Sequence, residues 1–186
     1  MPIEDAPKEV RDNIVEAQTK AHQIEVLKAV DCFIQNLAIR AVEHDQSKLS
    51  PEEADLFNEF GPRLKNTTYG SDEYFEIMEK LKPSLDHHYA NNRHHPDHFS
   101  DGIWGMNLLD LVEMFCDWLA ATKRHADGDL RKSIHINSDR FGISDQLTAI
   151  LLNSVAIFAD NKVVGNPAEN EENEDGKNET EVQGGV

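Results

Sequence analysis

Hydrophobic residues along most of this chain recur every three or four positions, which is the spacing of one face of an α-helix. The first such stretch runs from Lys8 to Glu43 and contains neither Gly nor Pro. Its spacing predicts helix throughout, with the apolar positions Val10, Ile14, Ala17, Ala21, Ile24, Leu27, Val30, Ile34, Leu37, Ala38 and Ala41.

Two shorter helices are predicted next. Ser50 followed by Pro51 is a helix start, and Glu53 completes a capping box with Ser50. Gly61-Pro62 is expected to end this helix. A further helix is predicted over 71–83, limited by Pro83, and a short one over 84–88.

The stretch 106–125 is apolar over most of its circumference, so it predicts a central helix. Irregular loops are expected over 91–102 and 126–142, and a last helix over 146–160. No segment alternates apolar and polar residues as a strand does. The pattern therefore predicts an all-α fold, a single-domain helical bundle of about six helices.

Composition refines this picture at the C-terminus. Residues 163–186 hold seven acidic residues and one lysine with almost no apolar residues, so we expect a disordered acidic tail. The predicted helical domain then covers residues 1–162. The cysteines Cys32 and Cys116 lie in apolar helical surroundings and are expected to be buried, reduced thiols, with a disulfide as the alternative.

The formal net charge of −17 excludes non-specific nucleic-acid binding, which depends on neutralising phosphates with Lys and Arg. No apolar run approaches the ~20 residues of a membrane helix, and the acidic N-terminus lacks a signal-peptide core. We therefore expect no membrane partner and a cytoplasmic location. A small anionic substrate stays compatible with the charge, because a metal ion can supply positive charge locally.

The candidate chemistry centres on His44-Asp45 and on the histidine-rich run from His87 to His98. Imidazole nitrogen and carboxylate oxygen together suit divalent Mn, Fe, Co, Ni or Zn, with Mg as an alternative. His88 and His95 are the expected ligands of the run. Within the doublets, the choice against His87 and against His94 stays open.

Three carboxylates, Asp110, Glu113 and Asp117, share one face of the predicted central helix. Carboxylates on an otherwise apolar helix are costly unless a cation neutralises them; a solvated stripe is the alternative. Asp117 is the expected ligand, with Asp110 as the fallback. Glu113 is a candidate to position or deprotonate a water molecule.

The order of these residues, His22, His44-Asp45, His87-His88 and Asp117, resembles that of the HD superfamily of metal-dependent phosphohydrolases. The segment HDQSK is similar to the family's HD-x-x-K core, and the small residue Ala121, four positions after Asp117, is similar to the family's closing motif. A short, little-characterised HD-like group of phages and bacteria is the nearest likeness. The location is then the host cytoplasm if the protein is phage-encoded.

The resemblance implies that a metal-dependent phosphohydrolase acts on a small phosphate ester, with a nucleotide as the expected substrate. One or two ions would be held by His22, His44, Asp45, His88, His95 and Asp117. Asp45, Lys48 and Glu113 are the expected catalytic residues, and the expected substrate-binding residues are Lys48, Asn92, Arg93 and Arg124.

A shared site for His22 and His44 requires a turn near 31–36, because 22 helical residues would separate them by ~33 Å. His22 is included chiefly for its place in the order. Two alternatives remain: a di-iron oxygenase of HD type, and a non-enzymatic, metal-stabilised helical interaction module. A homo-oligomer is left open.

Overall fold

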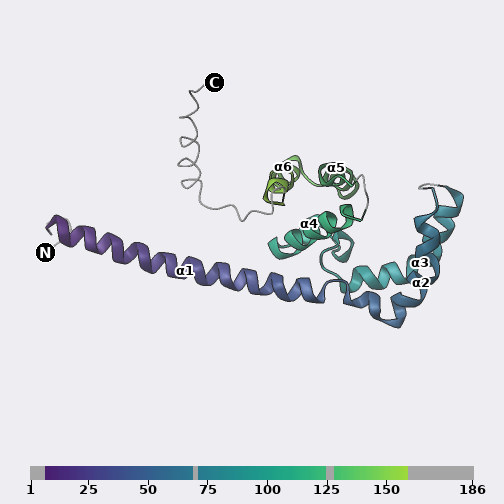
Figure 1. The fold of residues 1–186 in the computed structure, drawn as a ribbon, viewed down its shortest axis with the longest axis horizontal. Coiled ribbons are helices and arrows are strands. Elements are labelled where there is room, and N and C mark those ends of the chain that lie inside the picture. Colours follow the sequence, from purple (N-terminus) through teal and green to yellow (C-terminus); the bar gives the residue numbers. More distant parts are fainter. Residues whose placement is uncertain (1–6, 69–70, 125–127, 159–186) are drawn as a thin grey trace, which may run out of the picture. The chain divides into compact units, whose positions relative to one another are not determined.

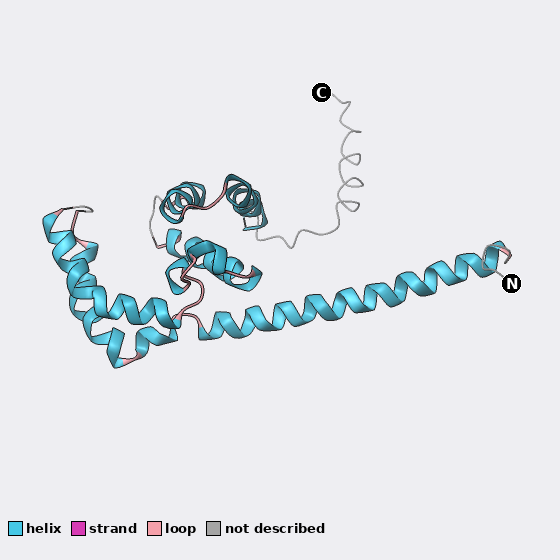
Figure 2. Ribbon diagram, turned by 180° about the vertical axis from the view of Figure 1, so that it is seen from behind, coloured by secondary structure: helices cyan, strands magenta, loops and turns pink. Residues whose placement is uncertain are grey.

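The all-α prediction is confirmed in the computed structural model. The described residues are 7–68, 71–124 and 128–158, apart from the side chains of Asp12 and Lys65. They form six α-helices and four short 3₁₀ helices, with no strand among them (Figure 2). Two compact units divide the chain, 1–124 and 125–186. The expected tail, 163–186, lies outside the described residues.

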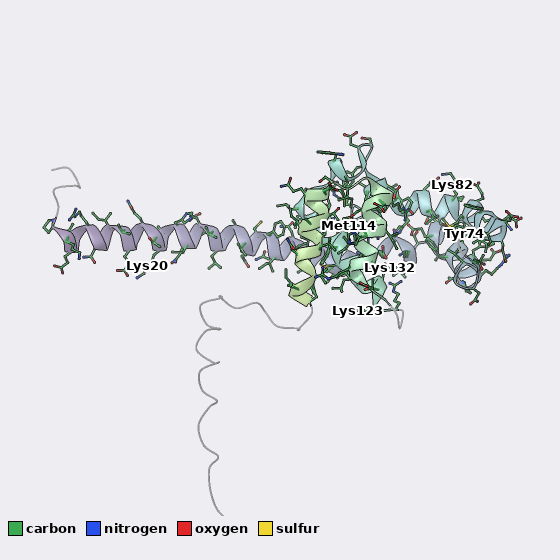
Figure 3. The ribbon with its side chains drawn as sticks, turned by 90° about the horizontal axis from the view of Figure 1, so that it is seen from above. Lys20, Tyr74, Lys82, Met114, Lys123 and Lys132 are labelled. Carbon is green, nitrogen blue, oxygen red and sulfur yellow. The ribbon has the colours of Figure 1, made fainter. Side chains whose placement is uncertain are left out.

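Helix α1, Lys8–Glu43, is unbroken, so the expected turn near 31–36 is wrong (Figure 1). The polar side chains there bond back to their own helix instead of ending it. The Gln35 amide donates to the Asp31 carboxylate at 2.7 Å, and the Asn36 amide donates to the Cys32 carbonyl at 2.7 Å. Most of α1 is exposed, including Lys20 (Figure 3).

Helices α2, Pro51–Lys65, and α3, Asp72–Asn91, pack against each other as a hairpin. Both pass through a proline that was expected to end or limit a helix, Pro62 in α2 and Pro83 in α3. An interior proline costs ~3 kcal/mol. Both prolines are exposed, and apolar residues on either side of each are buried or half-buried between the helices: Phe60, Leu64, Leu81 and Leu85. Tertiary packing therefore outweighs the local signal.

The hairpin core consists of Phe60, Ile77 and Leu81. After α3, the expected loop contains two 3₁₀ turns, η3 (Pro96–His98) and η4 (Gly102–Gly105). Helix α4, Leu108–Thr122, follows, and an Asn107–Asp110 capping box fixes its start. It packs against the C-terminal part of α1.

In the second unit, α5 (Leu130–Phe141) and α6 (Asp145–Ser154) pack together, and η5 (Val155–Phe158) continues the chain. The sequence interpretation of 126–142 as a loop is wrong over α5. Asp129 caps this helix by accepting from two backbone amides, and Gly142 ends it at φ 60°. The Thr148 hydroxyl donates to the Ser138 hydroxyl at 2.9 Å and joins the two helices.

Both cysteines, Cys32 and Cys116, are free and exposed, so the expectation that they are buried is wrong. Each lies on a helix whose nearby face is open to solvent. Across the described part of the chain, no helix is long and apolar enough to span a membrane.

Candidate metal centre

Asp45 stands at the junction between α1 and the 3₁₀ helix η2, Gln46–Leu49. Its backbone is left-handed, with φ 58°, and no other non-glycine residue in the described ranges has a positive φ. Aspartate tolerates this conformation better than most residues, at a cost of order 1–3 kcal/mol. Such a cost persists only where the surroundings require it, and here it turns the carboxylate towards three histidines.

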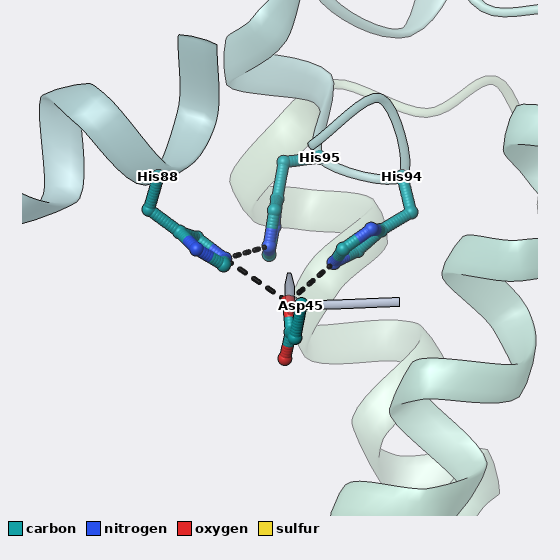
Figure 4. Close-up of side chains that lie close together, drawn as sticks. All are labelled: Asp45, His88, His94 and His95. Atoms are coloured by element: carbon teal, nitrogen blue, oxygen red, sulfur yellow. Dashed lines mark hydrogen bonds and ion pairs between the residues drawn. The ribbon is translucent and has the colours of Figure 1, made fainter. Parts of the chain in front are cut away.

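Those histidines are His88, near the C-terminal end of α3, and His94 and His95, in the turn that follows (Figure 4). The Nε2 atoms of His88 and His94 lie 3.3 and 3.5 Å from Oδ1 of Asp45. The two Nε2 atoms of His88 and His95 are 2.9 Å apart. All four ligand atoms lie within 4.8 Å of one another, so this Asp45 cluster can hold a metal ion.

The geometry suits an ion of the first transition row. Donors ~2.1 Å from one ion lie ~3.4 Å apart in a tetrahedron and ~3.0 Å apart in an octahedron. Two buried atoms at the centre of the cluster, Oδ1 of Asp45 and Nε2 of His94, have no hydrogen-bond partner among the described residues. Buried polar atoms are nearly always paired, and a cation held between these two atoms would give each of them a partner.

Glu113 on α4 orients two imidazoles. Its Oε1 lies 2.9 Å from Nδ1 of His44 and 3.3 Å from Nδ1 of His94. An ionised carboxylate only accepts hydrogen bonds, so each Nδ1 carries a proton and each Nε2 faces Asp45. Arg40 donates to the other oxygen of Glu113 at 2.7 Å and neutralises it. Glu113 thus contacts both imidazoles, and these three residues form a second group that could hold a metal ion. The expected role of Glu113 on water stays a prediction.

Glu53 has the same role for the α3 histidines, and sequence reasoning missed it. It is fully buried, and its two oxygens accept from Nδ1 of His87 at 2.7 Å and Nδ1 of His88 at 2.9 Å. Carboxylates that hold the far nitrogen of an imidazole are typical of metal sites. Ser50 makes no side-chain capping bond, so the capping-box interpretation is wrong. The sequence motif is the same whether Glu53 caps α2 or holds a histidine, so it could not distinguish these two roles.

These contacts shift the protonation of the histidines. Hydrogen bonds to Asp117 and then Glu113 raise the pKa of His44 to about 10. Burial, and after it the neighbouring His94 and His88, lowers the pKa of His95 to about 3. Burial alone would raise the pKa of Glu113, but hydrogen bonds from His44, His94 and Arg40 hold it below its ordinary value. His95 is thus neutral at pH 7, the form that binds metals.

The other oxygen of Asp45 faces a second set of groups. Oδ2 lies 3.5 Å from Nε2 of His44, and that nitrogen lies 3.6 Å from Oδ1 of Asp117. Burial would raise the pKa of Asp45, but the Lys48 ammonium, which donates to the same Oδ2 at 2.6 Å, together with His44 and His88, lowers it. Asp45 therefore lies between the three histidines of the Asp45 cluster and the pair His44 and Asp117.

The expected substrate-binding residues differ in their exposure and contacts. Lys48 is half-exposed beside Asp45. Asn92 is buried and donates to the Ser47 hydroxyl at 2.6 Å and the His88 carbonyl at 2.7 Å. Arg93 is half-exposed and donates to Asp110 at 3.1 and 3.0 Å. A role of either residue in substrate binding stays a prediction. Arg124 is exposed just beyond the end of α4.

Asp110, the fallback ligand, is fully buried between Arg93 and Arg40, whose nearest nitrogen lies 2.8 Å away. It also accepts from the Asn107 amide in the α4 capping box. Asp110 is thus held by these contacts away from His44, whereas α4 brings both Glu113 and Asp117 to that imidazole. A small polar cavity of about 160 Å³ opens beside these groups, lined by Arg40, Glu43, Asn91, Asn92, Arg93, His94 and Glu113.

His22 does not belong to the site, and its assignment as a ligand is wrong. It is exposed on the unbroken α1, 22 residues before His44 and hence ~33 Å from it along the helix axis. The structure brings together His44, Asp45, His88, His95 and Asp117 of the expected ligands, and adds His94. In the doublets, His88 faces Asp45 while His87 stays beside Glu53.

Fold and site together define an all-α protein with a cluster of histidines and carboxylates that can hold a metal ion. The chain belongs to the family of unknown function DUF5662, whose family model matches residues 11–157. No curated protein and no solved structure matches the chain. The resemblance to the HD superfamily stays a prediction.

Proposed function

We propose that this protein is a metal-dependent phosphohydrolase that acts on a small phosphate ester. The observation that carries the proposal is the Asp45 cluster, in which three imidazoles and a carboxylate converge and two buried atoms lack partners. A nucleotide is the substrate that the HD resemblance implies. No described side chain near the cluster identifies a base.

Asp45, His88, His94 and His95 would hold the ion, and His44 with Asp117 would complete a second position. A bound divalent ion supplies a water of lowered pKa and polarises phosphoryl oxygens. Glu53 and Glu113 hold the imidazoles so that Nε2 faces inward. The Lys48 ammonium stands at the rim, 42% exposed, where it can reach a phosphate.

The reaction balances without a further reagent. Water forms a new bond to phosphorus, the bond between phosphorus and the alcohol oxygen breaks, and the alcohol leaves with a proton from that water. The cluster lies in a strongly acidic chain, so local positive charge would come from the ion, Lys48 and the protonated His44. Arg40 and Arg93 are already committed to carboxylates.

The test uses untagged protein that is loaded in turn with Mn, Co, Ni or Mg and assayed for phosphate release from nucleotides and simple esters. Asp45→Ala and His44→Ala are expected to lose metal and activity. Lys48→Ala is expected to keep metal but turn over more slowly, because an ammonium cannot ligate a cation. Wild-type protein that binds metal and releases no phosphate from any ester would overturn the proposal.

One observation favours a second candidate, a di-iron oxygenase. The Oδ2 atom of Asp45 faces His44, which also contacts Asp117, so the site offers ligands for two ions in proximity. Purified protein with two irons per chain and O₂ consumption would support this candidate. One or two non-redox ions with phosphate release would support hydrolysis.

A further inference from the structure

An apolar groove borders His44. It lies between α1 and α4, has a volume of about 310 Å³, and is lined by Leu37, Ala41, His44, Val112, Glu113, Cys116, Asp117 and Ala120. All of these residues belong to the first unit. His44, which lines the groove, contacts Glu113 and Asp117 and lies 3.5 Å from Oδ2 of Asp45, so the groove borders the candidate metal centre.

The groove wall has two chemically distinct parts. Leu37 and Ala41 from α1 face Val112, Cys116 and Ala120 from α4, spaced four residues apart on each helix. Charged groups stand only where it meets the site: Glu113, which is held by Arg40 and His44, and the facing pair His44 and Asp117. Away from that end the lining offers a thiol and otherwise apolar side chains.

The volume limits what the groove can hold. An apolar cavity of ~150 Å³ takes a benzene molecule. The observed 310 Å³ therefore has room for a group of one or two rings, at the lower end of small-molecule sites. Away from His44, Glu113 and Asp117, the lining side chains offer no hydrogen-bonding group except the Cys116 thiol, so this part of the groove suits an apolar group better than a ribose.

We propose that this groove binds the apolar alcohol part of the substrate, so that the protein acts on aryl or alkyl phosphate esters in preference to nucleotides. The proposal rests on the proposed function, which places the phosphate at the candidate metal centre. It adds the substrate class, which is set by α1 and α4 and not by the metal ligands.

The test is calorimetric binding of non-hydrolysable anions to the full-length, Mn-loaded protein. Phenylphosphonate is expected to bind ~10- to 100-fold more tightly than methylphosphonate, from burial of the ring. Equal affinities would overturn the groove proposal and leave the proposed function standing. Binding of neither anion would overturn the phosphate site itself, and with it both proposals. Tighter binding of adenosine monophosphate than of phenylphosphonate would overturn the stated preference.

Variants that fill the groove test whether the tighter binding of phenylphosphonate arises there. Ala120→Phe and Ala41→Phe block it from opposite walls, and both positions are exposed, so no core contact is lost. Each is expected to abolish the advantage of phenylphosphonate and to leave methylphosphonate binding unchanged. Ala38→Phe, on α1 but outside the groove, is the matched control. Unchanged phenylphosphonate affinity in both folded groove variants would contradict the proposal.

The two cysteines provide an independent readout. Cys116 lines the groove, while Cys32 is exposed further along α1 and outside it. Phenylphosphonate is expected to slow alkylation of Cys116 several-fold and to leave Cys32 unaffected, as followed by peptide mass spectrometry. Equal protection of both thiols, or of neither, would contradict binding in the groove.

Discussion

Two histidines, His22 in the middle of α1 and His44 at its C-terminal cap, look alike in the sequence but have different surroundings in the structure. His22 and His44 both follow apolar helical turns, and both fit the order of an HD-like site. Only His44 has carboxylates around its ring, with Glu113 on Nδ1 at 2.9 Å and Asp117 3.6 Å from Nε2. His22 is exposed on a part of the helix with few contacts. A histidine can act as a ligand where neighbouring groups orient its ring. Its place in the order of residues along the chain does not show whether such groups are present.

The largest expected effect comes from removing a histidine that faces Asp45. His88→Ala should weaken metal binding by more than ~100-fold, because the loss of a ligand exceeds the 10- to 100-fold loss that follows removal of a supporting partner. His87→Ala is the matched control, since His87 shares Glu53 but not Asp45. The visible absorption of Co²⁺ titrated into each variant measures the affinity. Similar losses in both would show that the doublet does not divide as the geometry indicates.

A smaller effect is expected from the carboxylate that holds these rings. Glu53→Gln should weaken metal affinity by roughly 10- to 100-fold, because an amide holds the Nδ1 proton of His88 less strongly. Glu52→Gln changes the neighbouring exposed carboxylate and should leave the affinity unchanged. The same Co²⁺ titration distinguishes the two variants. An unchanged affinity in Glu53→Gln would assign Glu53 to packing alone.

The sequence predicted the helical class and the start of most helices. It also predicted Asp117, one of the two carboxylates of α4 that contact His44. It could not predict that α1 continues through Asp31 and Asn36, because short polar side chains end some helices and bond back within others. Nor could it show that Pro62 and Pro83 lie inside helices, since buried neighbours decide that outcome. Local sequence signals set the helix propensity of a segment, whereas tertiary packing determines whether the helix continues through it.

The site divides in the same way. Residue types and doublets predicted that His44, Asp45 and His88, whose side chains are common metal ligands, would come together. Glu53 and Arg40 were missed because nothing in the sequence marks a buried partner that comes from another helix. Arg93 and Asn92 were assigned to substrate by proximity in sequence, but Asp110 and Ser47 bind them. Long-range pairing of charges requires the three-dimensional arrangement.

The pH dependence of metal-free protein sharpens the comparison further. The pKa of His44 is raised from 6.5 to about 10, so its charged pairing with Asp117 and Glu113 stabilises the fold fully below pH 6.5 and is lost as the pH rises through 10. Melting curves of chelated wild-type protein and His44→Gln should therefore converge between pH 7 and pH 10. A difference in melting temperature that stays constant over this range would contradict the raised pKa of His44.

The smallest effect is expected at His22, in the middle of α1. His22→Ala should leave metal affinity, stoichiometry and melting temperature unchanged, because the side chain is exposed and ~33 Å from His44. Co²⁺ titration and thermal unfolding check this. A loss of metal in this variant would show that α1 bends in solution and would restore His22 to the site.

The most direct test of the central claim starts from protein stripped of metal. The protein is dialysed to equilibrium against Mn, Co, Ni or Zn, and its metal content is then determined by elemental analysis. Wild-type protein is predicted to retain one or two ions per chain, and Asp45→Ala none, because both candidate positions use that carboxylate. His22→Ala is predicted to match the wild type. Equal metal content in wild type and Asp45→Ala, or no bound metal in the wild type, would contradict the account.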